Sequence, residues 1–140
     1  MKKILLTGGT GFIGSHTCVS LLEQDYEVLV LDSCINSSGR SLYGIIKILK
    51  EKKIHKNQIQ FIKGDIRDEK LLKKIFYDAS ACNKPIEGVI HFAGLKSVKD
   101  SVINPLKYWE SNVSGTINLL KVMDIFDCRK IIFSSSASIY

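Results

Sequence analysis

A long apolar segment is missing from this sequence, since no run approaches the roughly 18 residues that a membrane-spanning helix requires. The opening residues, Met-Lys-Lys-Ile-Leu-Leu, faintly resemble the start of a signal peptide. Their apolar stretch stops after three residues in Thr-Gly-Gly, which is too short for the core of such a peptide. We interpret it as a first strand, and we expect a cytoplasmic protein without a membrane partner.

The spacings that mark metal sites and disulfide frameworks are missing as well. The four cysteines, at positions 18, 34, 82 and 128, include no C-x-x-C pair, and the three histidines are equally dispersed. We expect reduced, mostly structural thiols and no bound metal.

Charge patterning does not favour a nucleic-acid partner, although the formal net charge is +6. The basic residues are spread out, with one cluster at Lys47–Lys56 that alternates with apolar residues. This alternation is typical of the solvent-facing side of an amphipathic helix, and no aromatic platform accompanies it. We predict a helix surface rather than a nucleic-acid site.

What the sequence does contain is a regular alternation of strands and helices. Its 140 residues are 45% hydrophobic and show no repeat, linker or low-complexity tract, which predicts one domain. Short apolar runs that alternate with helical segments favour a parallel sheet with right-handed crossovers. The prediction is an α/β fold, a doubly wound parallel sheet of Rossmann type with strand order 3-2-1-4-5, ending after its fifth strand. Strands are expected at 4–6, 28–31, 59–63, 88–92 and 130–133, and helices at 41–53, 69–78 and 105–127.

The stretch around which this fold is organised is Thr7–Ser15, which reads T-G-G-T-G-F-I-G-S and lies between the first strand and a helix. Gly8 suits a tight turn, Gly11 allows the backbone to approach a pyrophosphate, and Gly14 lets the helix pack closely on its strand. The first N–H groups of the helix lack partners within it and carry the positive end of its dipole, so a diphosphate suits them. Taken alone, the spacing is also compatible with an ordinary glycine-rich turn.

A carboxylate at the end of the second strand supports the nucleotide interpretation. Asp32 follows the apolar strand 28–31 and lies 18 residues after Gly14. A carboxylate there can accept both ribose hydroxyls of an adenosine and would repel a 2′-phosphate. No arginine follows Asp32 immediately, so the sequence predicts NAD rather than NADP.

The ends of the third and fourth strands add further candidates. Asp65 lies where a side chain can hydrogen-bond the adenine amino group, with Ile66 against the ring, whereas Asp68 is better explained as the cap of the next helix. Ala93 and Gly94 are small residues at the point where a doubly wound sheet changes direction, so the backbone there can approach a ligand.

Several polar side chains have two interpretations each. Asn36 and Ser37 either reach the adenosine or form an ordinary turn. Lys96 either meets cofactor oxygens or faces solvent. Asn112 lies inside the long helix and needs a partner, either a water or a main-chain carbonyl near the cofactor. One of the serines at 134–136, after the fifth strand, is placed to hydrogen-bond a substrate alcohol.

Together these motifs resemble the extended short-chain dehydrogenase/reductase family, and within it the amino-terminal half of the UDP-glucose (UDP-galactose) 4-epimerases. The resemblance covers essentially the whole chain. Many relatives share the glycine motif, whereas the F-A-G-L-K form of the fourth strand is typical of the 4-epimerases. The segments that carry the resemblance are T-G-G-T-G-F-I-G-S-H-T at 7–17, G-D-I-R-D at 64–68, H-F-A-G-L-K-S-V at 91–98, N-V-S-G-T at 112–116 and F-S-S-S-A-S-I-Y at 133–140.

The resemblance implies a reaction and a set of site residues. A hydride passes from C4 of a UDP-hexose to NAD, the 4-keto sugar turns over in the site, and the hydride returns to the opposite face. Ser136 is implied as catalytic, together with a tyrosine and a lysine spaced Y-x-x-x-K. A homodimer that includes the long helix is implied as well. The implied NAD contacts are Phe12, Ile13, Asp32, Asn36, Ser37, Asp65, Ile66, Phe92, Ala93, Gly94 and Lys96.

Two departures from the family pattern are visible. Ser111 stands where the family often has a second asparagine before Asn112, and Tyr140 has no lysine four residues after it. We therefore expect the catalytic tyrosine and lysine, and the part that grips the UDP-sugar, to lie outside this chain. On its own the chain is expected to bind NAD without turnover.

Two other functions stay open. The first is another nucleotide-sugar enzyme of the same family, a dehydratase, decarboxylase or reductase, because substrate selection is expected outside this chain. The second is a non-catalytic NAD-sensing module.

Overall fold

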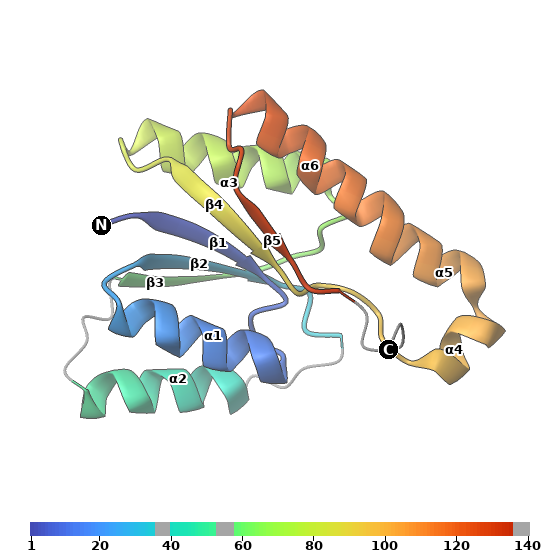
Figure 1. The fold of residues 1–140 in the computed structure, drawn as a ribbon, viewed down its shortest axis with the longest axis horizontal. Helices are drawn as coiled ribbons and strands as arrows, with labels where there is room; N and C mark the ends of the chain where they lie inside the picture. The colour runs from blue at the N-terminus through green and yellow to red at the C-terminus, as the bar shows by residue number, and fades with distance from the viewer. Residues whose placement is uncertain (36–39, 53–57, 136–140) are drawn as a thin grey trace.

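The computed structural model describes residues 1–35, 40–52 and 58–135. Its centre is a parallel sheet of five strands in the order β3-β2-β1-β4-β5, which confirms the predicted fold class and strand order (Figure 1). The strands are β1 (Lys3–Thr7), β2 (Glu27–Asp32), β3 (Ile59–Lys63), β4 (Ile86–His91) and β5 (Ile131–Phe133).

Two helices cover each face of the sheet. The helices α1 (Phe12–Glu23) and α2 (Arg40–Glu51) lie on one face, and α3 (Glu69–Ala81) and α6 (Gly115–Ile125) lie on the other (Figure 1). This arrangement follows from right-handed crossovers that reverse direction between β1 and β4.

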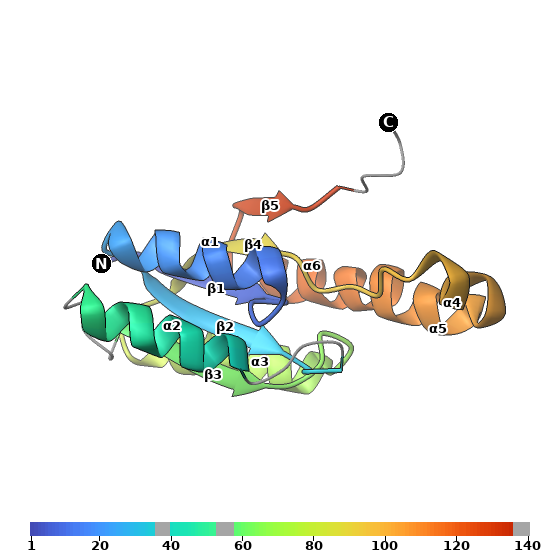
Figure 2. The same cartoon turned by 90° about the horizontal axis from the view of Figure 1, so that it is seen from below.

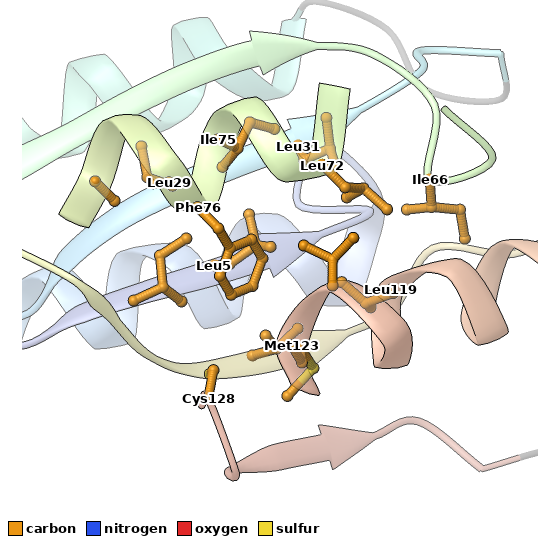
Figure 3. Packing of buried hydrophobic residues seen from close by; sticks show 14 residues of the cluster. Leu5, Leu29, Leu31, Ile66, Leu72, Ile75, Phe76, Leu119, Met123 and Cys128 are labelled. Carbon is orange, nitrogen blue, oxygen red and sulfur yellow. The ribbon is translucent and has the colours of Figure 1, made fainter. Parts of the chain in front are cut away.

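The strands supply both hydrophobic cores by alternation, because successive side chains of a strand point to opposite faces. Leu5, together with Leu29 and Leu31, packs against residues of α3 and α6 (Figure 3). Leu6 and its neighbours on β2 pack instead against residues of α1 and α2. Both cores are therefore made by the same apolar runs that indicated strands in the sequence.

The long helix expected at 105–127 is built from three consecutive segments. They are α5 (Pro105–Trp109), a π-helical turn at Glu110–Ser114, and α6, and the backbone stays helical at both junctions. A short helix, α4 (Val98–Ile103), precedes them and was not predicted. The α4 and α5 segments project past the carboxyl ends of the strands (Figure 2).

Asp68 begins α3 as its N-cap, as the sequence predicted. Its Oδ1 accepts a hydrogen bond of 3.0 Å from the backbone N–H of Leu71. The N-cap fixes where the loop after β3 ends and α3 begins. The residues between Lys63 and Asp68 therefore form a short segment beside the end of β2.

Two surfaces of the described chain stay apolar and uncovered. All three residues of β5 are exposed, and Phe133 is 58% accessible. Leu106 and Trp109 are also exposed on α5. Within residues 1–35, 40–52 and 58–135, each helix is too short or too polar to cross a lipid bilayer.

Candidate functional site

A cleft of about 410 Å³ lies at the carboxyl ends of β1, β2, β3 and β4. Ligands of doubly wound sheets bind at this edge, where the strand order reverses. Most of the candidate residues from the sequence line this one cleft, namely Gly8, Gly11, Phe12, Ile13, Asp32, Asp65, Ile66, Phe92, Ala93, Gly94 and Lys96.

The glycine-rich turn is packed so tightly that two of its positions exclude a side chain. Gly8 has a φ of +69°, in the left-handed region, and a Cβ there would lie 2.6 Å from the backbone N of Ala93. A Cβ at Gly14 would lie 2.3 Å from the carbonyl oxygen of Gly8. The turn at the end of β1 therefore packs against the backbone that follows β4, and the first turn of α1 packs directly on the glycine-rich turn.

The amino terminus of α1 opens into the cleft. Gly11 is its N-cap, and no side chain of the described residues caps the helix. Phe12 and Ile13, in the first turn, are 83% and 53% exposed and line the cleft. Backbone N–H groups at such a terminus attract an anion, and the two apolar side chains flank the approach to them.

Asp32 is held in place by two backbone amides at the end of β2. The N–H of Thr10 donates to Oδ2 over 2.9 Å, and the N–H of Cys34 donates to Oδ1 over 2.8 Å. These bonds connect the glycine-rich turn to the loop after β2 and fix the carboxylate at the rim of the cleft. An ionised carboxylate only accepts hydrogen bonds, so it suits ligand hydroxyls and disfavours ligand phosphates.

Asp65 forms a fork-shaped ion pair with Arg67. The Nε and Nη2 of Arg67 donate to Oδ1 and Oδ2 over 3.1 and 2.7 Å, and its backbone N–H donates to Oδ1 over 2.9 Å. The hydrogen bonds from Arg67 hold the pKa of the Asp65 carboxyl below its ordinary value. The carboxylate is therefore ionised and oriented at neutral pH.

Ile66, between these two residues, is packed onto the start of α6. A Cβ at Gly115 would lie 2.8 Å from the side chain of Ile66, so the end of that side chain packs directly against the backbone of α6. Ile66 is 5% exposed and still contributes to the wall of the cleft. The loop after β3 is thus supported from behind by α6.

A buried histidine, His91, links the ends of β1 and β4 to the long helix. Its Nδ1 lies 2.6 Å from the hydroxyl of Thr7, and its Nε2 lies 3.0 Å from the hydroxyl of Thr116. The Thr116 hydroxyl donates to the carbonyl oxygen of Asn112 over 2.6 Å, so it accepts from Nε2–H. The Thr7 hydroxyl accepts from the backbone N–H of Ala93 over 3.3 Å and donates to Nδ1.

These partners assign His91 as the neutral Nε2–H tautomer. The ring is 2% exposed, and burial lowers the pKa of His91 to about 4. The network runs beneath the cleft rather than along its surface. It therefore fixes the backbone that forms the cleft.

Asn112 takes the main-chain partner that was one of its two expected alternatives. Its Nδ2 donates to the carbonyl oxygen of Leu95 over 2.9 Å, and its Oδ1 accepts from the N–H of Leu95 over 2.8 Å. A Cβ at Gly94 would lie 3.2 Å from that Oδ1. Asn112 therefore clamps the loop after β4 from the π-helical turn, behind the cleft.

The remaining candidates fall into two groups. Gly14 lies beneath the turn and supports it, while Lys96 is exposed at the rim, so a cofactor contact for Lys96 stays a prediction. Asn36, Ser37 and Ser136 lie outside the described residues.

Sequence reasoning missed the buried polar residues Thr7, Thr10 and His91, and the partly buried Thr116 that contacts His91. One signal was available for the Thr7–His91 pair. They end neighbouring parallel strands in the predicted order and are direct register partners in the structure.

Comparisons with known proteins agree with this fold and cleft. The family model described as GDP-mannose 4,6 dehydratase matches residues 5–140. The UDP-glucose 4-epimerase of Neisseria meningitidis serogroup C is 50% identical over 141 residues, which cover 100% of this chain and 38% of that relative. The UDP-glucose 4-epimerase of Klebsiella pneumoniae is 45% identical over 138 residues, which cover 99% of this chain and 91% of that relative.

A solved structure supports the same assignment. The crystal structure of UDP-glucose 4-epimerase from Bifidobacterium longum in complex with NAD+ and UDP matches with a TM-score of 0.86 and 40% identity, covering 99% of this chain and 38% of that one. This chain thus spans 38% of the length of both the Neisseria and the Bifidobacterium proteins. The chain belongs to the family described as GDP-mannose 4,6 dehydratase, and its similarity within that family is to the UDP-glucose 4-epimerases.

Proposed function

We propose that the complete protein is a cytoplasmic, NAD-dependent enzyme that epimerises C4 of a UDP-hexose, and that this chain carries its dinucleotide site. The observation that supports this most strongly is the cleft itself. It combines an open helix terminus with a carboxylate at the end of β2, in a chain 50% identical to a UDP-glucose 4-epimerase.

The residues of the cleft fit NAD at each of its parts. The diphosphate is placed at the amino terminus of α1, where Gly11 brings no side chain between ligand and backbone. The adenosine ribose is placed against Asp32, whose charge would repel the 2′-phosphate of NADP. The adenine is placed beside Asp65 and Ile66, and the nicotinamide end beside the loop that Asn112 clamps.

When bound, NAD supplies a hydride acceptor that takes the hydrogen of the sugar C4 and gives it back. The 4-hydroxyl would lose its proton to a base in the same step, and the product would be a 4-keto sugar. Ser136 hydrogen-bonds the sugar 4-oxygen in this proposal. Return of the hydride and the proton to the other face of the 4-keto sugar would give the epimer, so the reaction would consume no outside oxidant or reductant.

The test is to give the complete protein UDP-galactose without added NAD and to follow the formation of UDP-glucose. Turnover is the expected result, because the hydride returns to the sugar and the bound cofactor is regenerated in every cycle. A protein that carries NAD but forms no epimer would overturn the proposal.

The description of the matched family favours a dehydratase as the second candidate. Product mass separates the two reactions, since epimerisation leaves the mass of the nucleotide sugar unchanged, whereas dehydration removes one water. The 140-residue chain by itself is proposed to bind NAD without turnover. Epimerisation by that chain alone would contradict this part.

A further inference from the structure

The Asp65 carboxylate has its acceptor sites unevenly filled. In the described part of the chain its three hydrogen bonds all come from Arg67, two of them to Oδ1 and one to Oδ2. Each carboxylate oxygen offers about two acceptor sites. Oδ1 is therefore filled, and Oδ2 keeps one acceptor site on a residue that lines the cleft.

Arg67 is itself fixed from the opposite side. Its carbonyl oxygen accepts a hydrogen bond of 3.1 Å from Nδ2 of Asn118 on α6, and its Nη1 lies 3.9 Å from a carboxylate oxygen of Glu110. The neighbouring Ile66 is packed onto Gly115. Arg67 therefore connects the long helix to the Asp65 carboxylate in the cleft. Its two parallel hydrogen bonds fix the plane of that carboxylate, which a single point charge such as a lysine ammonium would not do.

We propose that Arg67 is a positioning residue for the base end of the cleft, which holds Asp65 so that its remaining Oδ2 acceptor site takes the exocyclic amino group of adenine. This inference rests on the proposed NAD site and goes beyond it, because it assigns base selectivity to a residue that does not touch the base. A base that carries a carbonyl oxygen at that position would place one hydrogen-bond acceptor against another, the Asp65 carboxylate. Such a base would therefore bind more weakly than adenine.

The experiment compares the affinity of the 140-residue chain for NAD and for nicotinamide hypoxanthine dinucleotide, in which a carbonyl oxygen replaces the amino group. We expect the unaltered chain to bind NAD about tenfold more tightly or better, because the partly buried Asp65 carboxylate has no hydrogen-bond donor to accept from when the ligand carries a carbonyl oxygen. Arg67→Gln should reduce this ratio to about threefold or less, and Arg67→Lys should give an intermediate ratio because it keeps the charge and loses the fork.

A matched control is available at the other end of the sheet. Arg129 pairs with Asp127 two positions before it, through Nε over 2.7 Å, and lies before β5 at the amino ends of the strands. Arg129→Gln should leave the ratio unchanged. Asp65→Asn, which puts an amide N–H donor within reach of the carbonyl oxygen, should shift preference toward the hypoxanthine dinucleotide.

The outcomes separate this inference from the proposed function. Binding of neither dinucleotide would overturn both, whereas equal binding of the two by the unaltered chain would overturn only the role of Asp65 and Arg67. A ratio in Arg67→Gln equal to that of the unaltered chain, with NAD still bound and the far-ultraviolet circular dichroism unchanged, would overturn the positioning role.

Discussion

At the scale of single residues, the site depends on polar groups that face one another beneath the cleft. His91 is the central one, because both ring nitrogens are used and each partner is itself held by a backbone group. Protonation of Nδ1 would place a second donor against the Thr7 hydroxyl, whose own proton then lacks its acceptor. The network therefore exists only with a neutral ring.

This arrangement predicts a specific dependence of stability on pH. The pKa of His91 is about 4 in the folded chain against an ordinary value of 6.5, so between these values the unfolded chain binds a proton that the folded chain does not. The stabilisation is fully present above pH 6.5 and is lost as the pH falls toward 4. The free energy of unfolding, measured by urea denaturation, should fall by about 2 kcal/mol between pH 7 and pH 5.

The control for this prediction is His91→Gln. The variant should be less stable throughout but should lose most of the slope between pH 5 and pH 7. The carboxyl groups with lowered pKa values, Glu27, Asp65 and Glu69, titrate below this window. An unchanged slope in the variant would contradict the assigned state of the ring.

Some of the site residues could be predicted from the sequence, and others could not. Asp32 was predictable because its role depends on local order, a carboxylate directly after a strand. His91 and Thr7 are 84 positions apart, and their contact depends on the pairing of β1 with β4. The fork between Asp65 and Arg67 is local, but nothing in the spacing of the two residues distinguishes an oriented carboxylate from a solvated one.

At the scale of elements, the apolar runs predicted the strands most clearly where helices bury both faces of the sheet, as they do for β1, β2 and β4, whereas the edge strands β3 and β5 contain no buried residue. The third strand has the predicted bounds, while β4 begins at Ile86 instead of Gly88. The π-helical turn at Glu110–Ser114 was not predictable, because its residues also fit an ordinary α-helix. The position of Asn112 in that turn gives it the reach to clamp Leu95.

Gly14 provides a test of how α1 is seated. Gly14→Ala should lower the free energy of unfolding by about 2 kcal/mol or more and weaken NAD binding, because its Cβ would lie 2.3 Å from the Gly8 carbonyl oxygen, which is backbone. The matched control is Gly44→Ala in α2, where a Cβ would meet no atom of the described residues within 4 Å. That variant should gain about 0.5–1 kcal/mol. Equal effects of the two substitutions in urea denaturation would contradict the packing described for the turn.

At the scale of the whole molecule, the uncovered apolar surface along α5 and α6 fits the proposed homodimer. Leu106, Trp109, Ile117 and Leu120 are all exposed along this segment. An exposed apolar stripe of this kind is more often an interface than a solvated surface. The homodimer stays a proposal, and the described surface supports it through this stripe.

Self-association tests this surface. Trp109→Lys should raise the dissociation constant of the dimer at least about tenfold in sedimentation equilibrium, because it places a charge in an apolar contact. Tyr77→Lys on α3 is the matched control, since Tyr77 and Trp109 are both 65% exposed. A chain that stays monomeric, or equal weakening by both substitutions, would contradict an interface on α5.

The dinucleotide site in the cleft is tested by titrating the ¹⁵N-labelled chain with NAD and recording the backbone amide resonances. We expect shifts at Gly11–Gly14, Gly64–Ile66 and Ala93–Leu95, with Glu27 and Ile86 at the amino ends of their strands unchanged. NADP should cause much smaller shifts at the same concentration, because Asp32 repels its 2′-phosphate. The absence of shifts with NAD, or shifts centred on the amino ends of the strands, would contradict a dinucleotide site in this cleft.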